Sequence, residues 1–267
     1  MLQQAEDFRE EGKALYRLLD TLSADDWHRP TLFKDWTVND VIQHIHAGDL
    51  NAMLSATDPA GFTALRADIA AQRASGLSRV EETRRRLENI EGPALLTRWM
   101  ASLEELCDVL GAMDPNERLK WVARDMGVRM FTTARQMETW AHGQAIYDLL
   151  GKDRDASDRI KNIAVIGVRT FGWTFANRDQ PVPPDLPYVR LQAPSGAVWE
   201  WNDPSKESVE GDAVAFCQVV TQTRNVADTN LSVTGDTAQR WMAIAQCFAG
   251  PPEDPPPPGA RQKATAD

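Results

Sequence analysis

Glu138 and His142 stand four residues apart in the sequence RQMETWAHG (residues 135–143). On a helix, this spacing places both side chains on one face about one turn apart. A carboxylate oxygen and an imidazole nitrogen placed in this way can bind one divalent cation. By spacing alone, such a pair is also typical of an ordinary contact on a helix surface.

A third donor comes from an earlier segment, DVIQHIH (residues 40–46), which carries His44 and His46 among apolar residues. Positions i and i+2 of a helix differ by about 200°, so these two histidines cannot easily bind the same ion. The apolar neighbours Val41 and Ile45 favour His44 as the residue that points inward. We therefore expect His46 to lie beside the ligands or to face solvent.

Two imidazole nitrogens and one carboxylate would leave one coordination position open for water or substrate. An open position is typical of catalytic sites, whereas structural sites are closed. Zinc suits this set of donors. Ferrous iron, nickel and cobalt are also accepted by two histidines and a carboxylate, and the order of metal affinities cannot choose among them.

Two segments of the chain match a known pair of motifs. Residues 35–44, DWTVNDVIQH, fit the pattern W-T-V-x-D-x-x-x-H, and residues 135–143 fit R-x-x-E-x-x-x-H-G. In this order, and about ninety residues apart, they resemble the N-terminal domain of the DinB-like, mycothiol-dependent maleylpyruvate isomerase superfamily. The resemblance implies a four-helix bundle in which His44, Glu138 and His142 bind the metal.

The second half of the chain resembles the same family less tightly. Residues 209–224 run from VEGDA through an apolar stretch to TQTR, and they are similar to a family segment that ends in Gly-Arg, with Thr223 in place of the glycine. The resemblance implies that Arg224 is a catalytic group reaching the cleft, where a guanidinium can hold a substrate carboxylate by two bonds. An arginine at a helix end also often satisfies backbone carbonyls. Overall, the chain most resembles an actinobacterial branch described only as metal-binding proteins.

Helical spacing of apolar residues dominates the first half of the chain, where strand-like alternation is almost absent. Thr37 is the expected N-cap of the second helix, with Asp40 completing a capping box, and Gly151 is the expected stop of the fourth. These features predict a DinB-like four-helix bundle over residues 1–152. Its helices are expected at about 2–22, 37–55, 63–90 with 94–112, and 128–150.

Beyond the bundle, the pattern becomes that of a small α+β domain over residues 153–250. A proline-rich linker precedes two runs of alternating residues, which predict a hairpin. The predicted fold class is therefore mainly α with a smaller α+β domain. We expect its helices at about 156–176, 211–223 and 236–249, and its strands at 188–193, 198–201 and 231–233.

The end of the chain, residues 251–267, begins PPEDPPPP and continues with polar residues. This composition predicts a disordered or extended proline-rich tail. We expect its removal to leave folding and metal content intact.

Charge and composition exclude several classes of function. A net charge of −10 and a pI near 5.0 argue against a nucleic-acid partner, because such binding depends on Lys and Arg contacts to phosphates. No apolar stretch approaches the about 20 residues that span a bilayer, and no signal peptide is evident, so we expect no membrane partner and a cytoplasmic protein. Three widely separated cysteines suggest neither disulfides nor a cysteine zinc site. The arginine run at residues 84–86 is expected to be a solvated helix face.

These observations favour a divalent-metal-dependent enzyme acting on a small-molecule substrate, as a monomer or homodimer. Its open metal site would activate a thiol, or polarise a small carbonyl or carboxylate substrate, for isomerisation or transfer. The resemblance implies mycothiol, or another low-molecular-weight thiol, as cosubstrate. A thiol-independent cyclase, lyase or dehydratase, and a non-catalytic metal-dependent ligand-binding module, remain as alternatives.

Overall fold

The computed structural model describes residues 2–122 and 124–265. The chain divides into two compact units, Met1–Ile146 and Tyr147–Asp267, whereas the sequence placed the boundary after residue 152. The described part is mostly helical with a small sheet, which confirms the predicted fold class. No helix in this part is both long enough and apolar enough to cross a bilayer.

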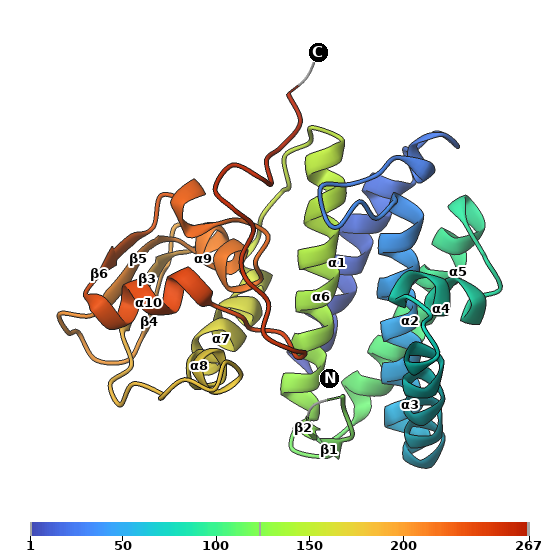
Figure 1. Cartoon of the computed structure of the whole chain (residues 1–267), viewed down its shortest axis with the longest axis horizontal. Helices are drawn as coiled ribbons and strands as arrows, with labels where there is room; N and C mark the ends of the chain where they lie inside the picture. Colours follow the sequence, from blue (N-terminus) through green and yellow to red (C-terminus); the bar gives the residue numbers. More distant parts are fainter. Residues whose placement is uncertain (1, 123, 266–267) are drawn as a thin grey trace. The chain divides into compact units, whose positions relative to one another are not determined.

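Four long helices build the first unit (Figure 1). Both α1 and α2 pack on α5, and side-chain hydrogen bonds join α2 to α6. Gly12 lets α1 approach α5 closely, because a Cβ there would lie 2.5 Å from a methyl group of Leu103. These four helices are α1 (Gln3–Leu19), α2 (Val38–Thr57), α5 (Gly92–Ala112) and α6 (Val128–Leu149).

The predicted capping box begins α2. The Thr37 hydroxyl accepts a hydrogen bond from the Asp40 backbone N–H (3.2 Å), and the Asp40 carboxylate accepts one from the Thr37 backbone N–H (3.0 Å). The other Asp40 oxygen accepts a hydrogen bond from Arg84 Nε (2.8 Å) and lies 2.7 Å from Arg84 Nη2 in an ion pair. One aspartate therefore fixes the start of α2 and also fastens α4 against it.

The region predicted as one helix over 63–90 consists of two, α3 (Pro59–Ala74) and α4 (Arg79–Arg86). Gly76 has a φ of +99°, which a side chain would strain, and Ser78 starts α4 with its own capping box. Both helices pack on α2. A short antiparallel pair, β1 (Arg118–Leu119) and β2 (Met126–Gly127), precedes α6 and was not predicted. A 3₁₀ turn, η1 (Asp26–His28), precedes α2.

The second unit contains a four-stranded sheet in the order β4-β3-β5-β6 (Figure 1). The predicted hairpin is confirmed as the antiparallel pair β3 and β4, but β5, which pairs parallel with β3, was not predicted. The helix expected from about residue 211 begins instead at Ala213, because Asp212 caps it through bonds from Val214 and Ala215. The strands are β3 (Tyr188–Gln192), β4 (Val198–Trp201), β5 (Ser208–Asp212) and β6 (Ser232–Thr234).

Helices bury the sheet of this unit. α9 packs on β3 and β5, and α10 packs on β6. Val189 and Leu191, which alternate along β3, are fully buried, as the period of a strand requires. The helix expected at 156–176 is interrupted at Thr170. The elements are η2 (Asp158–Ile160), α7 (Lys161–Arg169), α8 (Phe171–Ala176), α9 (Ala213–Val220), η3 (Val226–Asp228) and α10 (Asp236–Ile244).

The end of the chain, predicted as a disordered or extended tail, is irregular in the residues that the structure describes. Residues 251–265 contain no helix or strand, yet the second unit binds them through hydrogen bonds. Gln222 Nε2 donates to the Glu253 carbonyl (2.8 Å), Asn225 Nδ2 donates to the Pro256 carbonyl (2.8 Å), and the Arg261 guanidinium donates to the Gln222 carbonyl (2.7 Å). Proline residues have no backbone N–H donor. A proline-rich segment is therefore held on the second unit by side chains that donate hydrogen bonds to its backbone carbonyls.

Candidate metal centre

The three predicted ligands meet between α2 and α6. His44 Nε2 lies 3.7 Å from Glu138 Oε2, and His142 Nε2 lies 3.2 Å from the same oxygen. One possible ligand atom from each residue lies within 4.8 Å of the other two. Zinc bonds of about 2.0–2.1 Å in tetrahedral geometry separate neighbouring donors by roughly 3.3 Å. The donor spacing therefore fits a single ion.

The site is partly open to solvent. The exposed fraction of the side chain is 21% for His44, 25% for Glu138 and 14% for His142. A closed structural site would hide all of its donors behind a fourth ligand. Three donors and an accessible side are what a catalytic metal ion requires.

Electrostatics favour the protonation states that bind a cation. Burial lowers the pKa of His44 to about 4, against the opposing effect of Glu138. For Glu138, burial opposes ionisation, but the nearby His142 and His44 side chains outweigh it and hold the pKa of the carboxyl well below its usual range. An ionised carboxylate beside a neutral His44 imidazole favours the binding of a cation.

Two aromatic side chains from the loop before α2 pack on the imidazoles. The Trp36 ring lies 5.2 Å from the His44 ring and stacks on that of His142 at 6.1 Å, and the Phe33 ring meets His142 edge-on at 5.0 Å. The site predicted from the sequence included neither Trp36 nor Phe33. The position of Trp36 inside the first motif was the available signal for its role.

The same loop is held in a strained conformation. Lys34 and Asp35 both have φ near +55°, at 54° and 56°, although neither is glycine. Such a conformation costs roughly 1 kcal/mol per residue. Hydrogen bonds from Thr31 N to the Trp36 carbonyl (2.8 Å) and from Trp36 N to the Phe33 carbonyl (3.0 Å) close the loop. The loop thereby keeps both aromatic rings against the candidate ligands.

A buried ion pair fixes α2 against α6 next to the site. Arg135 Nε and Nη2 donate to Asp49 Oδ1 at 3.1 and 3.0 Å, and Trp99 Nε1 of α5 donates to Asp49 Oδ2 at 3.0 Å. The two charged side chains are only 5% and 0% exposed. Burial raises the pKa of Asp49, and Arg135 and Trp99 oppose that rise. Because Arg135 lies three residues before Glu138, this pair aligns the two helices that supply the ligands.

Gly48 makes room for this contact. A Cβ on Gly48 would lie 2.6 Å from Arg135 Nη2, so any larger residue would push the guanidinium away. With glycine there, Arg135 Nη2 also reaches the Ile45 carbonyl (3.3 Å). The arginine is therefore bound both to a side chain and to the backbone of α2.

Comparison with known proteins adds an independent observation. Residues 8–147 match the model of the mycothiol maleylpyruvate isomerase N-terminal domain. The chain belongs to this family. The match spans the helical unit and contains all three candidate ligands.

Relatives and solved structures agree with the family assignment. Two uncharacterized proteins of Mycobacterium tuberculosis, from strains CDC 1551 and H37Rv, are each 37% identical to this isomerase-family chain over 247 residues, 92% of the chain and 95% of each relative. The crystal structure of the mycothiol-dependent maleylpyruvate isomerase is similar at 11% identity with a TM-score of 0.52, and covers 81% of this chain and 87% of its own. A histidine-to-alanine mutant of that enzyme gives a TM-score of 0.50 at the same identity and coverage. These two structures support the fold of this family member.

For this family member, the sequence suggested that His46 lies beside the ligands or faces solvent. In the structure it does neither. It is fully buried, and both of its ring nitrogens lack a hydrogen-bond partner among the described residues. Burial, with Arg98 of α5 and Arg86 of α4, lowers the pKa of His46 to about 4. The correction has a simple cause, since α4 and α5 cover the face of α2 that the sequence alone left open.

Arg224, the predicted catalytic arginine of this family member, belongs to the second unit. Its two terminal nitrogens donate to the two carboxylate oxygens of Asp148 at 2.7 and 2.6 Å. Asp148 lies in the last turn of α6, the helix that also carries Glu138 and His142. The two-point grip that the sequence led us to expect for a substrate carboxylate is thus made to a carboxylate of the protein.

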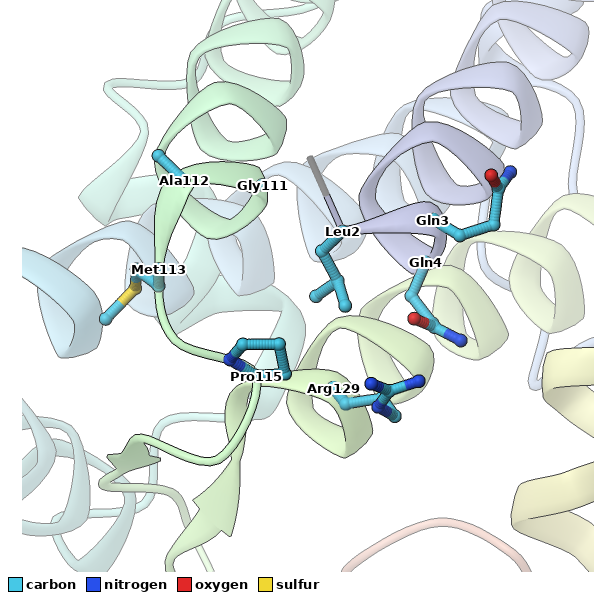
Figure 2. Close-up of a pocket in the computed structure, with 8 residues that line it drawn as sticks. All are labelled: Leu2, Gln3, Gln4, Gly111, Ala112, Met113, Pro115 and Arg129. Atoms are coloured by element: carbon cyan, nitrogen blue, oxygen red, sulfur yellow. The ribbon is translucent and has the colours of Figure 1, made fainter.

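A cavity of about 390 Å³ lies elsewhere in the helical unit, where the start of α1 meets the end of α5 (Figure 2). None of the predicted site residues lines it. It contains neither a histidine nor a carboxylate and so offers no donor set for a metal ion. Its lining residues are Leu2, Gln3, Gln4, Gly111, Ala112, Met113, Pro115 and Arg129.

We expect Arg135→Met to destabilise the helical unit by about 3–5 kcal/mol, because it leaves the Asp49 carboxylate buried without its cation. Chemical denaturation measures the loss. Arg129→Met is the matched control, since Arg129 is an exposed arginine of the same helix and should change stability by less than about 0.5 kcal/mol.

Adding Asp49→Asn to Arg135→Met should cost less than the two single changes together, because the charges depend on each other. If Arg135→Met costs below about 1 kcal/mol, or if the effects simply add, the pair does not hold α2 to α6.

Proposed function

We propose that this chain binds one divalent metal ion, zinc first, through His44, Glu138 and His142, and that it is an enzyme of the mycothiol-dependent isomerase type. The convergence of three N and O donors on a partly open site, in a member of this family, carries the proposal. A metal held there would supply Lewis acidity, lowering the pKa of a bound thiol or polarising a carbonyl of a small substrate for isomerisation or transfer.

The residues of the chain divide the work around such an ion. Glu138 provides the negative charge that binds a cation, while His44 and His142 provide imidazole nitrogens whose orientation is set by ring contacts with Trp36 and Phe33. The aromatic rings also cover one side of the site, which limits the approach of water and strengthens electrostatic interactions there. The uncovered side is where a thiol and a substrate would enter.

Arg224 is the proposed group for a substrate carboxylate. Its planar guanidinium makes two parallel bonds to Asp148, which is the geometry that it would offer to a free carboxylate of similar shape. In that role Arg224 would exchange Asp148 for the substrate, and Asp148 would keep the guanidinium aligned between turnovers.

Cobalt substitution tests the hypothesis that the metal site binds a thiol. In cobalt-loaded protein, a low-molecular-weight thiol such as N-acetylcysteine should produce a thiolate-to-cobalt charge-transfer band in the near ultraviolet. His142→Ala should abolish cobalt binding and the band, whereas His28→Ala, at an exposed histidine, should keep both. If cobalt binds but its absorption spectrum does not change when the thiol is added, the result would favour a thiol-independent cyclase, lyase or dehydratase, or a non-catalytic binding module.

Arg224→Lys should leave metal content unchanged and lower kcat/KM for maleylpyruvate, with mycothiol present, by at least about tenfold, because a lysine lacks the two-point fork. Asp148→Asn leaves the guanidinium in place and should retain most of the turnover. Equal loss of activity and of stability in both variants would show that Arg224 is only the partner of Asp148.

A further inference from the structure

Four arginines of α3 and α4 form what we name the arginine cluster, Arg66, Arg73, Arg79 and Arg86. Seven residues separate Arg66 from Arg73 on α3, and seven separate Arg79 from Arg86 on α4, so each pair shares one helix face about two turns apart. The two helices pack on each other and on α2. The sequence interpretation recognised only the neighbouring run at residues 84–86 and treated it as a solvated face.

One buried carboxylate joins the two helices at this cluster. Glu82, whose side chain is 2% exposed, accepts from Arg86 Nε at 3.1 Å and from Arg73 Nη2 at 3.4 Å. Arg86 also donates to the Asn51 side chain of α2 at 2.9 Å. Glu82 therefore pairs with two of the four arginines of the cluster.

Arg66 has no such partner. Among the residues that the structure describes, it makes no hydrogen bond and no ion pair, although it is half-buried. Burial lowers its pKa, and the nearby charges of Arg73, Arg79 and Arg86 lower it further, against Glu82 alone. A partly desolvated guanidinium among other guanidiniums is costly, and an anion is what would relieve the cost.

The whole chain carries a net charge of −10, so general attraction cannot gather small anions on it. A concentration of arginines on two packed helices of such an acidic protein favours a specific anionic ligand.

We propose that the arginine cluster is a binding site for a small dianion, with carboxylate or phosphate oxygens. Guanidinium groups bind both kinds of oxygen by paired hydrogen bonds, and Arg66 provides donors that none of the described protein groups uses. This inference rests on the proposed function in one respect, namely that the bound anion is the acidic substrate of the proposed enzyme. Anion binding by the cluster does not itself require a metal.

Calorimetric titration of the full-length, metal-free protein with succinate, and separately with inorganic phosphate, tests the proposal. Omitting the metal keeps a failure of the metal assignment distinct from a failure of the anion site. We expect at least one anion to bind, and Arg66→Gln to weaken it by about tenfold, the size of one lost charge-assisted contact. Binding of succinate alone indicates a carboxylic acid, and binding of phosphate alone indicates a phosphate ester.

Two further variants keep the test decisive. Arg79→Gln removes an exposed cation from the first turn of α4, where a positive charge is unfavourable to the helix, so this variant should fold and should also bind the anion more weakly. Arg85→Gln, an exposed arginine of the same helix outside the cluster, should bind it like the unchanged protein. No binding of either anion at millimolar concentration, or equal weakening by Arg85→Gln, would overturn the proposal.

Discussion

The ion pair between Arg135 and Asp49 is the constraint on which the candidate site depends. His44 comes from one helix and Glu138 and His142 from another, so their separation is set by how α2 lies on α6. A buried arginine and aspartate are costly unless their hydrogen bonds are all made. Asp49 completes its set with Trp99, and Arg135 completes its own with the Ile45 carbonyl. Sliding either helix by one turn would break these bonds. The ion pair therefore favours one alignment of α2 relative to α6.

The candidate centre is also prepared electrostatically. Its carboxylate is ionised and its His44 imidazole is neutral before any ion arrives, and the strained loop of Lys34 and Asp35 holds two aromatic rings against the imidazoles. Strain of this kind persists only where the surrounding structure imposes it. The loop therefore belongs to the structure that prepares the candidate centre.

Much of this could be predicted from the sequence, because helical periodicity is a local property. The i,i+4 spacing placed Glu138 and His142 on one face, and the 200° between His44 and His46 left only His44 to join them, as the structure has it. The family resemblance, confirmed by the match to the N-terminal domain model, supplied the pairing of segments ninety residues apart. Thr37 caps the start of α2 and Gly151 follows the end of α6, both as predicted, because the chemistry of helix caps is also local.

The failures have a common cause in tertiary contacts. The residues near His46 in the sequence do not reveal that α4 and α5 cover this side chain. The strand β5 can be recognised only from its pairing with β3. The proline-rich end is attached because Gln222 and Asn225, far earlier in the chain, reach its carbonyls. Arg224 was predicted to hold a substrate carboxylate, and its bonds to Asp148 could not be foreseen without the fold.

Anomalous scattering from crystals of the protein, purified without added metal and measured on both sides of the zinc edge, tests the central claim most directly. We expect one peak per chain, bonded to His44, Glu138 and His142, with a water or buffer molecule completing its coordination. A peak at any other place, or a zinc-replete crystal with no peak among these three residues, would contradict the account.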